Sequence, residues 1–274
     1  MSTDVRRPAV AGYFYPDDPD DLRGMVEQFL GEVDAERRRA RGAIAPHAGL
    51  VYSGQCAAHV FARVEIPRTV VILAPNHTGR LGAPGGASLW RSGAFDTPLG
   101  PVPIDSGFAS MLESECDLVA HDPEAHAREH AVEVELPFLR LLAPDSAIVP
   151  LVLAWDDWDR CKTLGAALAE AIEKNDGPVL LVASSDMTHY EPADRAAEKD
   201  RAALAAVEKL DGELLLRTCH DRNVTMCGRA PAATVLEAAR RQGAGSAEVV
   251  DYRHSGMVTG DDSSVVAYAG VVVS

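Results

Sequence analysis

The chain has 274 residues, of which 47% are hydrophobic and 24% are charged. This length and composition predict a globular protein with a sizeable core and exclude a disordered or fibrous one. The 26 Lys and Arg residues against 41 Asp and Glu residues give a formal net charge of −15, which repels nucleic-acid phosphates and anionic lipid. We therefore expect neither a nucleic acid nor a membrane as a partner.

Cellular context is indicated by the N-terminus and the cysteines. The first residues lack an apolar core of signal-peptide length, and no stretch has the length of a membrane span. The five cysteines form no C-x-x-C pair and leave an odd one over, so a disulfide framework is not expected. These features favour a cytoplasmic protein.

The predicted elements alternate along the chain. Apolar runs predict strands at 42–46, 69–74, 147–153, 178–183 and 265–273, and helical periodicity predicts helices at 18–31, 53–63, 130–142, 159–174, 193–210 and 228–241. Continuous apolar strands indicate a sheet that is covered on both sides. We expect one α/β domain over residues 1–274, with a central, largely parallel or mixed β-sheet flanked by helices on both faces.

Three of the predicted strands are followed by a histidine. His47 follows "AIAP", His77 follows "VVILAPN", and His189 lies in "SSDMTHY" after the fourth apolar run. In such sheets ligands collect beyond the carboxyl ends of the strands, so these side chains are expected at one edge. An isolated histidine is more often structural, but the repeated strand-Pro-His-Gly context favours His47 and His77 as metal ligands.

The third ligand is less evident, and Cys227 in "TMCGRAP" is the best candidate. It precedes a predicted helix, whose N–H groups and dipole favour a thiolate, and Arg229 adds positive charge. A small buried thiol with no chemical role is an equal alternative from spacing alone.

Other polar residues complete the expected site. His189, oriented by Asp186, is suited to proton transfer, although Asp186 has helix capping as an alternative role. The candidate catalytic residues are His189, Asp186 and His130, and the candidate substrate-binding residues are Asn76, Tyr190, Glu135 and Arg229.

A competing motif occurs at 126–130, where His126, Glu129 and His130 match the H-x-x-E-H signature of zinc hydrolases. Residues 121–129 are strongly polar and are expected to form a loop, because regular apolar spacing begins only near Val132. We therefore prefer His130 as a site residue at the start of a helix and expect His121 and His126 to be solvent-exposed loop residues.

Segments in a fixed order along the whole chain resemble the MEMO family, also called AmmeMemoRadiSam system protein B. They are "RRPAVAGYFYP", "APHAGLVYSG", "APNHTG", "DTPLGPVPID", "EHAVEVELPFL", "SSDMTHY", "MCGRAP" and "DSSVVAYAGVVV". The resemblance implies a fold similar to the LigB-type class III extradiol dioxygenases, with non-haem Fe(II) at the sheet edge. It also implies a ligand set of His47, His77 and Cys227, the cysteine replacing the glutamate of the dioxygenases, with Asp186, His189 and His130 in the remaining site motifs.

Two classes of function follow from this resemblance. In the first, the chain is a metal-dependent oxidoreductase acting on an unknown small molecule, with Fe(II) as the expected metal, then copper, then zinc. In the second, the same pocket is a non-catalytic adaptor that recognises an anionic or phosphorylated peptide, as described for animal members. Microbial members are associated with a radical-SAM partner. A zinc hydrolase using His126 and His130 ranks third.

Overall fold

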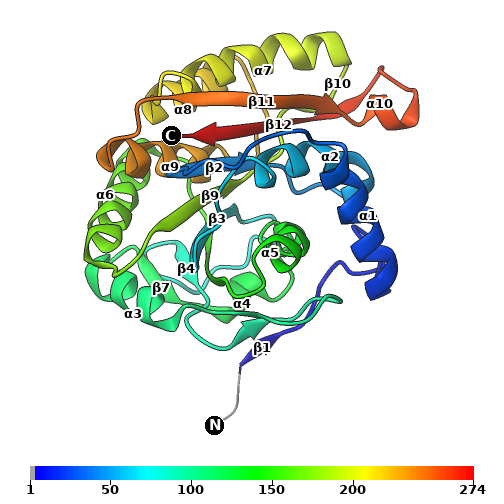
Figure 1. Ribbon diagram of the computed structural model, residues 1–274. Helices are drawn as coiled ribbons and strands as arrows, with labels where there is room; N and C mark the ends of the chain where they lie inside the picture. Colours follow the sequence, from blue (N-terminus) through cyan, green and yellow to red (C-terminus); the bar gives the residue numbers. More distant parts are fainter. Residues whose placement is uncertain (1–3) are drawn as a thin grey trace.

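The computed structural model describes residues 4–274, and its ribbon shows a central sheet with helices packed around it (Figure 1). The strands are β1 (Val5–Arg6), β2 (Gly42–Ala45), β3 (Thr69–Pro75), β4 (Ala87–Leu89), β5 (Ala94–Phe95), β6 (Val102–Pro103), β7 (Val119–His121), β8 (Ala147–Leu153), β9 (Val179–Ser184), β10 (His189–Glu191), β11 (Ala247–His254) and β12 (Val265–Val273). The helices are α1 (Pro19–Gly31), α2 (Leu50–Phe61), α3 (Ser106–Glu115), α4 (Pro123–His126), the 3-10 turn η1 (Glu133–Glu135), α5 (Leu136–Leu142), α6 (Trp158–Lys174), α7 (Ala193–Val207), α8 (Gly212–Asp221), α9 (Arg229–Arg241) and α10 (Gly256–Thr259).

The large sheet is mixed. Its strand order is β10-β12-β2-β9-β3-β8-β4-β7, with β11 paired to β12. The central strands β2, β9, β3 and β8 run parallel, whereas β12 pairs antiparallel with β2, and β4 pairs antiparallel with β8. The carboxyl ends of β2, β3 and β9 therefore meet at one edge, just before His47, Asn76 and Ser185 in the chain. The predicted α/β fold with a mixed central sheet is confirmed.

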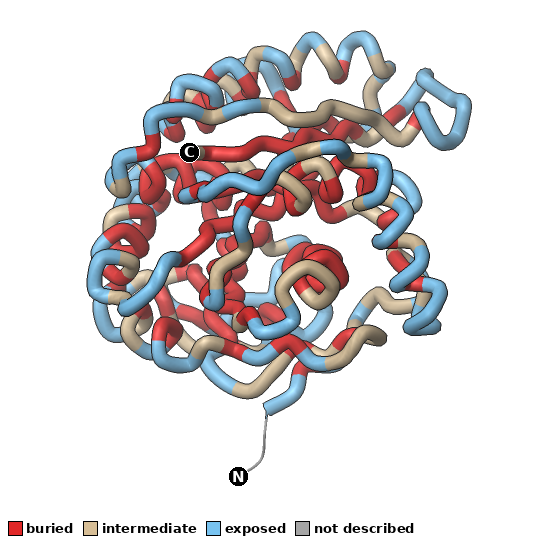
Figure 2. Tube along the Cα trace, viewed as in Figure 1, coloured by how far each residue is buried: buried red, intermediate tan, exposed pale blue. Residues whose placement is uncertain are grey.

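Helices cover both faces of this sheet. A Cβ at Gly42 would lie 2.7 Å from Val235 in α9, and one at Gly270 would lie 2.8 Å from Val60 in α2. Val273 pairs with Gly42, and Gly270 lies three residues before Val273, so the two glycines point to opposite faces. The sheet and its facing helix surfaces consequently form the buried interior, seen as the red segments of Figure 2.

The N-terminal segment is tied to the segment that precedes α5. Buried Arg6 donates from Nε to the carbonyl of His126 and from its guanidinium to the carbonyl of Glu129. Arg6 also pairs with the carboxylate of Glu133, which accepts a hydrogen bond from the Tyr15 hydroxyl at 2.5 Å. Because the candidate site residue His130 lies within 126–133, these contacts help to fix its position.

Some predicted elements differ from the structure. The helix predicted at 130–142 begins as a 3-10 turn and becomes α-helical only from Leu136, because Pro137 has no N–H and fits only the first turn of an α-helix. Helices α3 and α8 and the half-exposed strand β11 were not predicted. Part of the predicted loop at 121–129 is helix α4, with His121 at the end of β7.

No helix formed by residues 4–274 is long and apolar enough to cross a lipid bilayer.

Candidate metal centre

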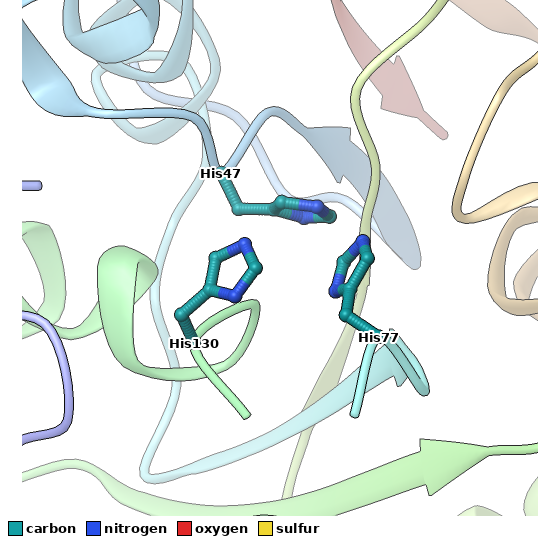
Figure 3. Close-up of side chains that lie close together, drawn as sticks. All are labelled: His47, His77 and His130. Atoms are coloured by element: carbon teal, nitrogen blue, oxygen red, sulfur yellow. The ribbon is translucent and has the colours of Figure 1, made fainter. Parts of the chain in front are cut away.

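Three histidine side chains meet at the carboxyl edge of the sheet (Figure 3). His47 follows β2, His77 follows β3, and His130 lies in the segment before η1. One ring nitrogen of each lies within 4.8 Å of those of the other two, and this is the one such group of three potential ligand side chains found in residues 4–274. The rings of His77 and His130 stack with their centroids 4.6 Å apart, and His47 meets both edge-on.

A single buried carboxylate holds two of these histidines. Glu129 accepts hydrogen bonds from the backbone N–H groups of His77, His130 and Ala131 at 2.7, 2.9 and 3.0 Å. Its Oε1 also lies 2.9 Å from Nδ1 of His77 and 3.4 Å from Nδ1 of His130. A carboxylate bound to Nδ1 leaves Nε2 of the same ring free as a ligand atom, which is the usual arrangement behind a metal-binding histidine.

His47 is held differently. Its Nδ1 lies 2.8 Å from the hydroxyl of Ser184 at the end of β9, and its backbone N–H donates to Oδ1 of Asp186 at 2.9 Å. Both contacts arise because β2 and β9 are parallel neighbours, with Ala45 beside Ser184 in the register. The His47 ring is fully buried, so its orientation is set by the sheet itself.

The surroundings give the three imidazoles different proton affinities. Burial lowers the pKa of His47 well below its ordinary value, and the neighbouring His77 and His130 lower it further. Burial also lowers the pKa of His130. For His77, burial lowers the pKa, but the hydrogen bond and charge of Glu129 outweigh it and raise the value overall. Neutral imidazole is the form that binds metal, and burial favours this form for His47 and His130.

Cys227 lies beside this cluster. Its Sγ is 3.3 Å from Nε2 of His47 and 3.2 Å from the backbone N–H of Asp186. Burial and the charge of Asp186 raise the pKa of the Cys227 thiol, despite the helix α9 that begins two residues later. Without a bound cation the thiol form is therefore favoured, contrary to the thiolate that the helix N-terminus alone suggests, because desolvation outweighs the dipole.

Asp186 and His189 do not form the expected pair. Asp186 accepts from the N–H groups of His47 and Ala48 through Oδ1, and burial raises its pKa to about 6. His189 instead receives its contacts from Thr225, whose hydroxyl accepts from the His189 N–H at 2.7 Å and whose carbonyl lies 3.1 Å from Nδ1. A carbonyl only accepts, so Nδ1 of His189 carries a proton and Nε2 is free to accept one.

The expected substrate-binding residues occupy three environments. Asn76 and Arg229 line a cavity of about 630 Å³ that Cys227 also lines, together with apolar side chains that include Trp155. Arg229 is paired there with Asp156, which offsets its charge. Tyr190 is 78% exposed and has a backbone φ of +58°, whereas Glu135 is completely buried behind Ser184.

The expectation that His121 and His126 are solvent-exposed loop residues was wrong. His121 is half-buried in β7, and His126 is 1% exposed in α4, with Nε2 2.9 Å from the carbonyl of Ser88 and its ring against Trp90 and Phe95. The carbonyl of Ser88 provides a hydrogen-bond partner for Nε2 of the buried ring, and hydropathy alone does not reveal such a contact.

Two residues are more central than the sequence reasoning recognised. Glu129 was considered only as part of the hydrolase motif, and Ser184 was not among the candidate site residues, but they hold the rings of His77 and His47. The adjacency of Glu129 to His130 was the available sequence signal for the first. Nothing local marked Ser184, because its role depends on strand pairing.

Comparison with known proteins agrees with this arrangement of motifs. A family model described as Memo-like protein matches residues 6–272. A MEMO1 family protein of Methanopyrus kandleri is 42% identical, covering 97% of this chain and 98% of the relative, and one of Aquifex aeolicus is 41% identical, covering 98% of each. The crystal structure of an uncharacterized protein from Escherichia coli K12 matches with a TM-score of 0.54 and 16% identity, over 84% of this chain and 99% of the other, and shows likeness of fold alone. With a family model covering nearly its whole length and relatives above 40% identity, this chain belongs to the Memo-like family.

Proposed function

We propose that this protein binds a transition-metal ion through His47, His77 and His130 and uses it in redox chemistry. The observation that carries the proposal is the convergence of three imidazoles within 4.8 Å, two of them held by one buried carboxylate. Imidazole ligands suit Fe(II), copper and zinc, and we propose Fe(II) first, with copper as the alternative.

The residues present fit such an ion. Glu129 and Asp186 are buried acids beside the cluster, so a dication would offset negative charge that the site otherwise carries at neutral pH. Three protein ligands leave coordination positions open for a substrate. When bound, Fe(II) or copper supplies one-electron chemistry that the side chains alone lack.

The remaining residues have roles that their contacts support. Cys227, 3.3 Å from Nε2 of His47, is placed either to join the ligand set, as the sequence-based set of His47, His77 and Cys227 requires, or to donate its S–H to that nitrogen. His189 is placed to accept a proton at Nε2, because Thr225 holds its Nδ1. Asn76 and Arg229 place the substrate in the adjoining cavity.

All five cysteines are unpaired, and we propose a cytoplasmic setting, where thiols stay reduced.

The test is metal analysis of protein purified anaerobically and supplied with Fe(II) or Cu(I). We expect near-stoichiometric metal in the wild type and loss of most of it in His47→Ala, His77→Ala and His130→Ala. A matched control is His220→Ala, because the His220 side chain is 89% exposed on α8. Retention of metal by all three site variants would overturn the proposal.

The Cys227→Ser variant then decides the ligand set. Full metal content in Cys227→Ser together with loss in His130→Ala identifies the three-histidine set. The reverse result identifies His47, His77 and Cys227, and an O2-consumption assay with candidate substrates becomes the next measurement in either case.

A further inference from the structure

One buried acid behind the centre has no role in the proposed chemistry. Glu135 ends η1, is 0% exposed, and forms no ion pair with any side chain of residues 4–274. Its Oε1 lies 2.9 Å from the Ser184 hydroxyl, and its Oε2 has no hydrogen-bond partner within the same described part of the chain. An ionised carboxylate in such a place would pay several kcal/mol of desolvation energy with nothing to offset it. Burial accordingly raises the pKa of Glu135 well above its ordinary value, and the charge of Asp186 adds to this.

The Ser184 hydroxyl has three neighbours and only one hydrogen to give. Its Oγ lies 2.7 Å from the carbonyl of Ala131, 2.8 Å from Nδ1 of His47 and 2.9 Å from Oε1 of Glu135. A backbone carbonyl only accepts, so the 2.7 Å contact requires the serine hydrogen to point at Ala131. The two remaining neighbours must then both donate to Oγ, which has two lone pairs to receive them.

This requirement fixes two protonation states. His47 must carry its hydrogen on Nδ1, and Glu135 must be the neutral acid, donating its O–H. The opposite tautomer of His47 would need the serine hydrogen for itself and would leave the oxygens of Ser184 and Ala131 facing each other at 2.7 Å with no hydrogen between them.

From this we infer that Glu135 and Ser184 are positioning residues, which hold His47 in the tautomer that presents a lone pair on Nε2 to the other two histidines. Glu135 acts as a neutral hydrogen-bond donor and touches neither the ion nor the substrate. The part of the inference that concerns metal affinity rests on the proposed function, whereas the tautomer of His47 can be measured without metal.

The affinity arm uses anaerobic Co(II) titration followed by absorption spectroscopy. Glu135→Gln keeps a neutral donor of nearly the same shape, so we expect a Kd within about threefold of wild type. Glu135→Met removes the hydrogen bond from Glu135 to Ser184, and Ser184→Ala removes the hydroxyl that holds His47. Loss of a hydrogen bond that orients a metal-binding histidine lowers metal affinity by about 10- to 100-fold. The control is Thr234→Val, which removes a buried hydroxyl from α9.

The tautomer arm uses long-range proton–nitrogen NMR on metal-free protein labelled at histidine, with the His47 signals assigned by their loss in His47→Gln. We expect the proton on Nδ1 in the wild type and in Glu135→Gln, and a mixture of tautomers in Ser184→Ala. This arm remains decisive if Glu135→Met does not fold.

The outcomes distinguish the inference about the His47 tautomer from the proposed metal-binding function. A wild-type protein with the proton on Nδ1 of His47 that binds none of Co(II), Fe(II) and Cu(I) keeps the inference and overturns the proposed function. A proton on Nε2 in the wild type overturns the inference, as does a Glu135→Gln variant that loses as much Co(II) affinity as Glu135→Met.

Discussion

Glu129 and Glu135 lie six residues apart, are both buried, and hold opposite protonation states. Glu129 accepts from three backbone N–H groups and contacts two imidazoles. Although burial raises its pKa, the hydrogen bond and charge of His77 outweigh it, and the pKa of Glu129 is lowered. Glu135 meets only the Ser184 hydroxyl, and its pKa is raised. Burial is common to both, so the number and charge of the donors decide which acid is ionised.

The difference divides the centre into two halves. The rings of His77 and His130 lie beside a charge that raises their basicity, whereas the ring of His47 is held by a neutral chain that fixes its tautomer. Each half therefore responds differently to the loss of its acid.

The largest effect is expected for Glu129→Gln. The amide cannot accept from every donor that surrounds the carboxylate, and its own N–H₂ would face other N–H groups. We expect the free energy of unfolding to fall by about 3 kcal/mol and most metal to be lost. Urea unfolding and anaerobic metal titration measure the two effects.

Glu135→Gln is the matched variant, because it makes the same chemical change six residues away. Since Glu135 is already neutral, the free energy of unfolding should change by less than about 1 kcal/mol. Equal losses of unfolding free energy in Glu129→Gln and Glu135→Gln would show that both acids are ionised. The distinction between the Glu129 side and the Glu135 side of the centre would then be wrong.

Burial also controls the protonation of a histidine, His126, and this affects stability at acid pH. Burial lowers the pKa of His126 to about 4, and its Nδ1 has no partner to stabilise a proton. Between pH 6.5 and 4 the unfolded chain binds this proton and the folded protein does not, so stability falls as the pH falls. The full loss by pH 4 is about 3 kcal/mol.

The measurement is urea unfolding at several pH values for wild type and His126→Gln. The variant is expected to be less stable at pH 7 but to lose less between pH 6.5 and 4. Parallel pH profiles would mean that His126 takes up its proton while folded.

The smallest effect is expected for an exposed pair. Arg229 and Asp156 form an ion pair in which the side chains are 36% and 58% exposed. Water already solvates both charges, so Arg229→Ala should change the free energy of unfolding by less than about 1 kcal/mol. A loss comparable to that of Glu129→Gln would show that exposure is not what separates strong from weak carboxylate contacts here.

The sequence predicted the central elements because their signals are local. Runs such as 69–74 and 265–273 are apolar without interruption, and β3 and β12 lie there. Strand β11 was missed because its sequence mixes charged and apolar residues on a half-exposed strand at the side of β12. The helix predicted from residue 130 is α-helical only from Leu136, because Pro137 fits only the first turn of an α-helix, and this outweighed the apolar spacing before it.

The sequence by itself determined that His47 and His77 follow strands of one sheet, since a strand-Pro-His-Gly pattern needs no distant residue to be recognised. It also placed Cys227 before a helix. Only the tertiary structure brought His130 against both histidines and surrounded Glu129 with its donors. The register of β2 and β9 set Ser184 beside His47, and the packing of η1 brought Glu135 to the same hydroxyl. The protonation of these side chains depends on groups that are 49 to 180 positions apart in the chain, and such contacts have no signature in a local stretch.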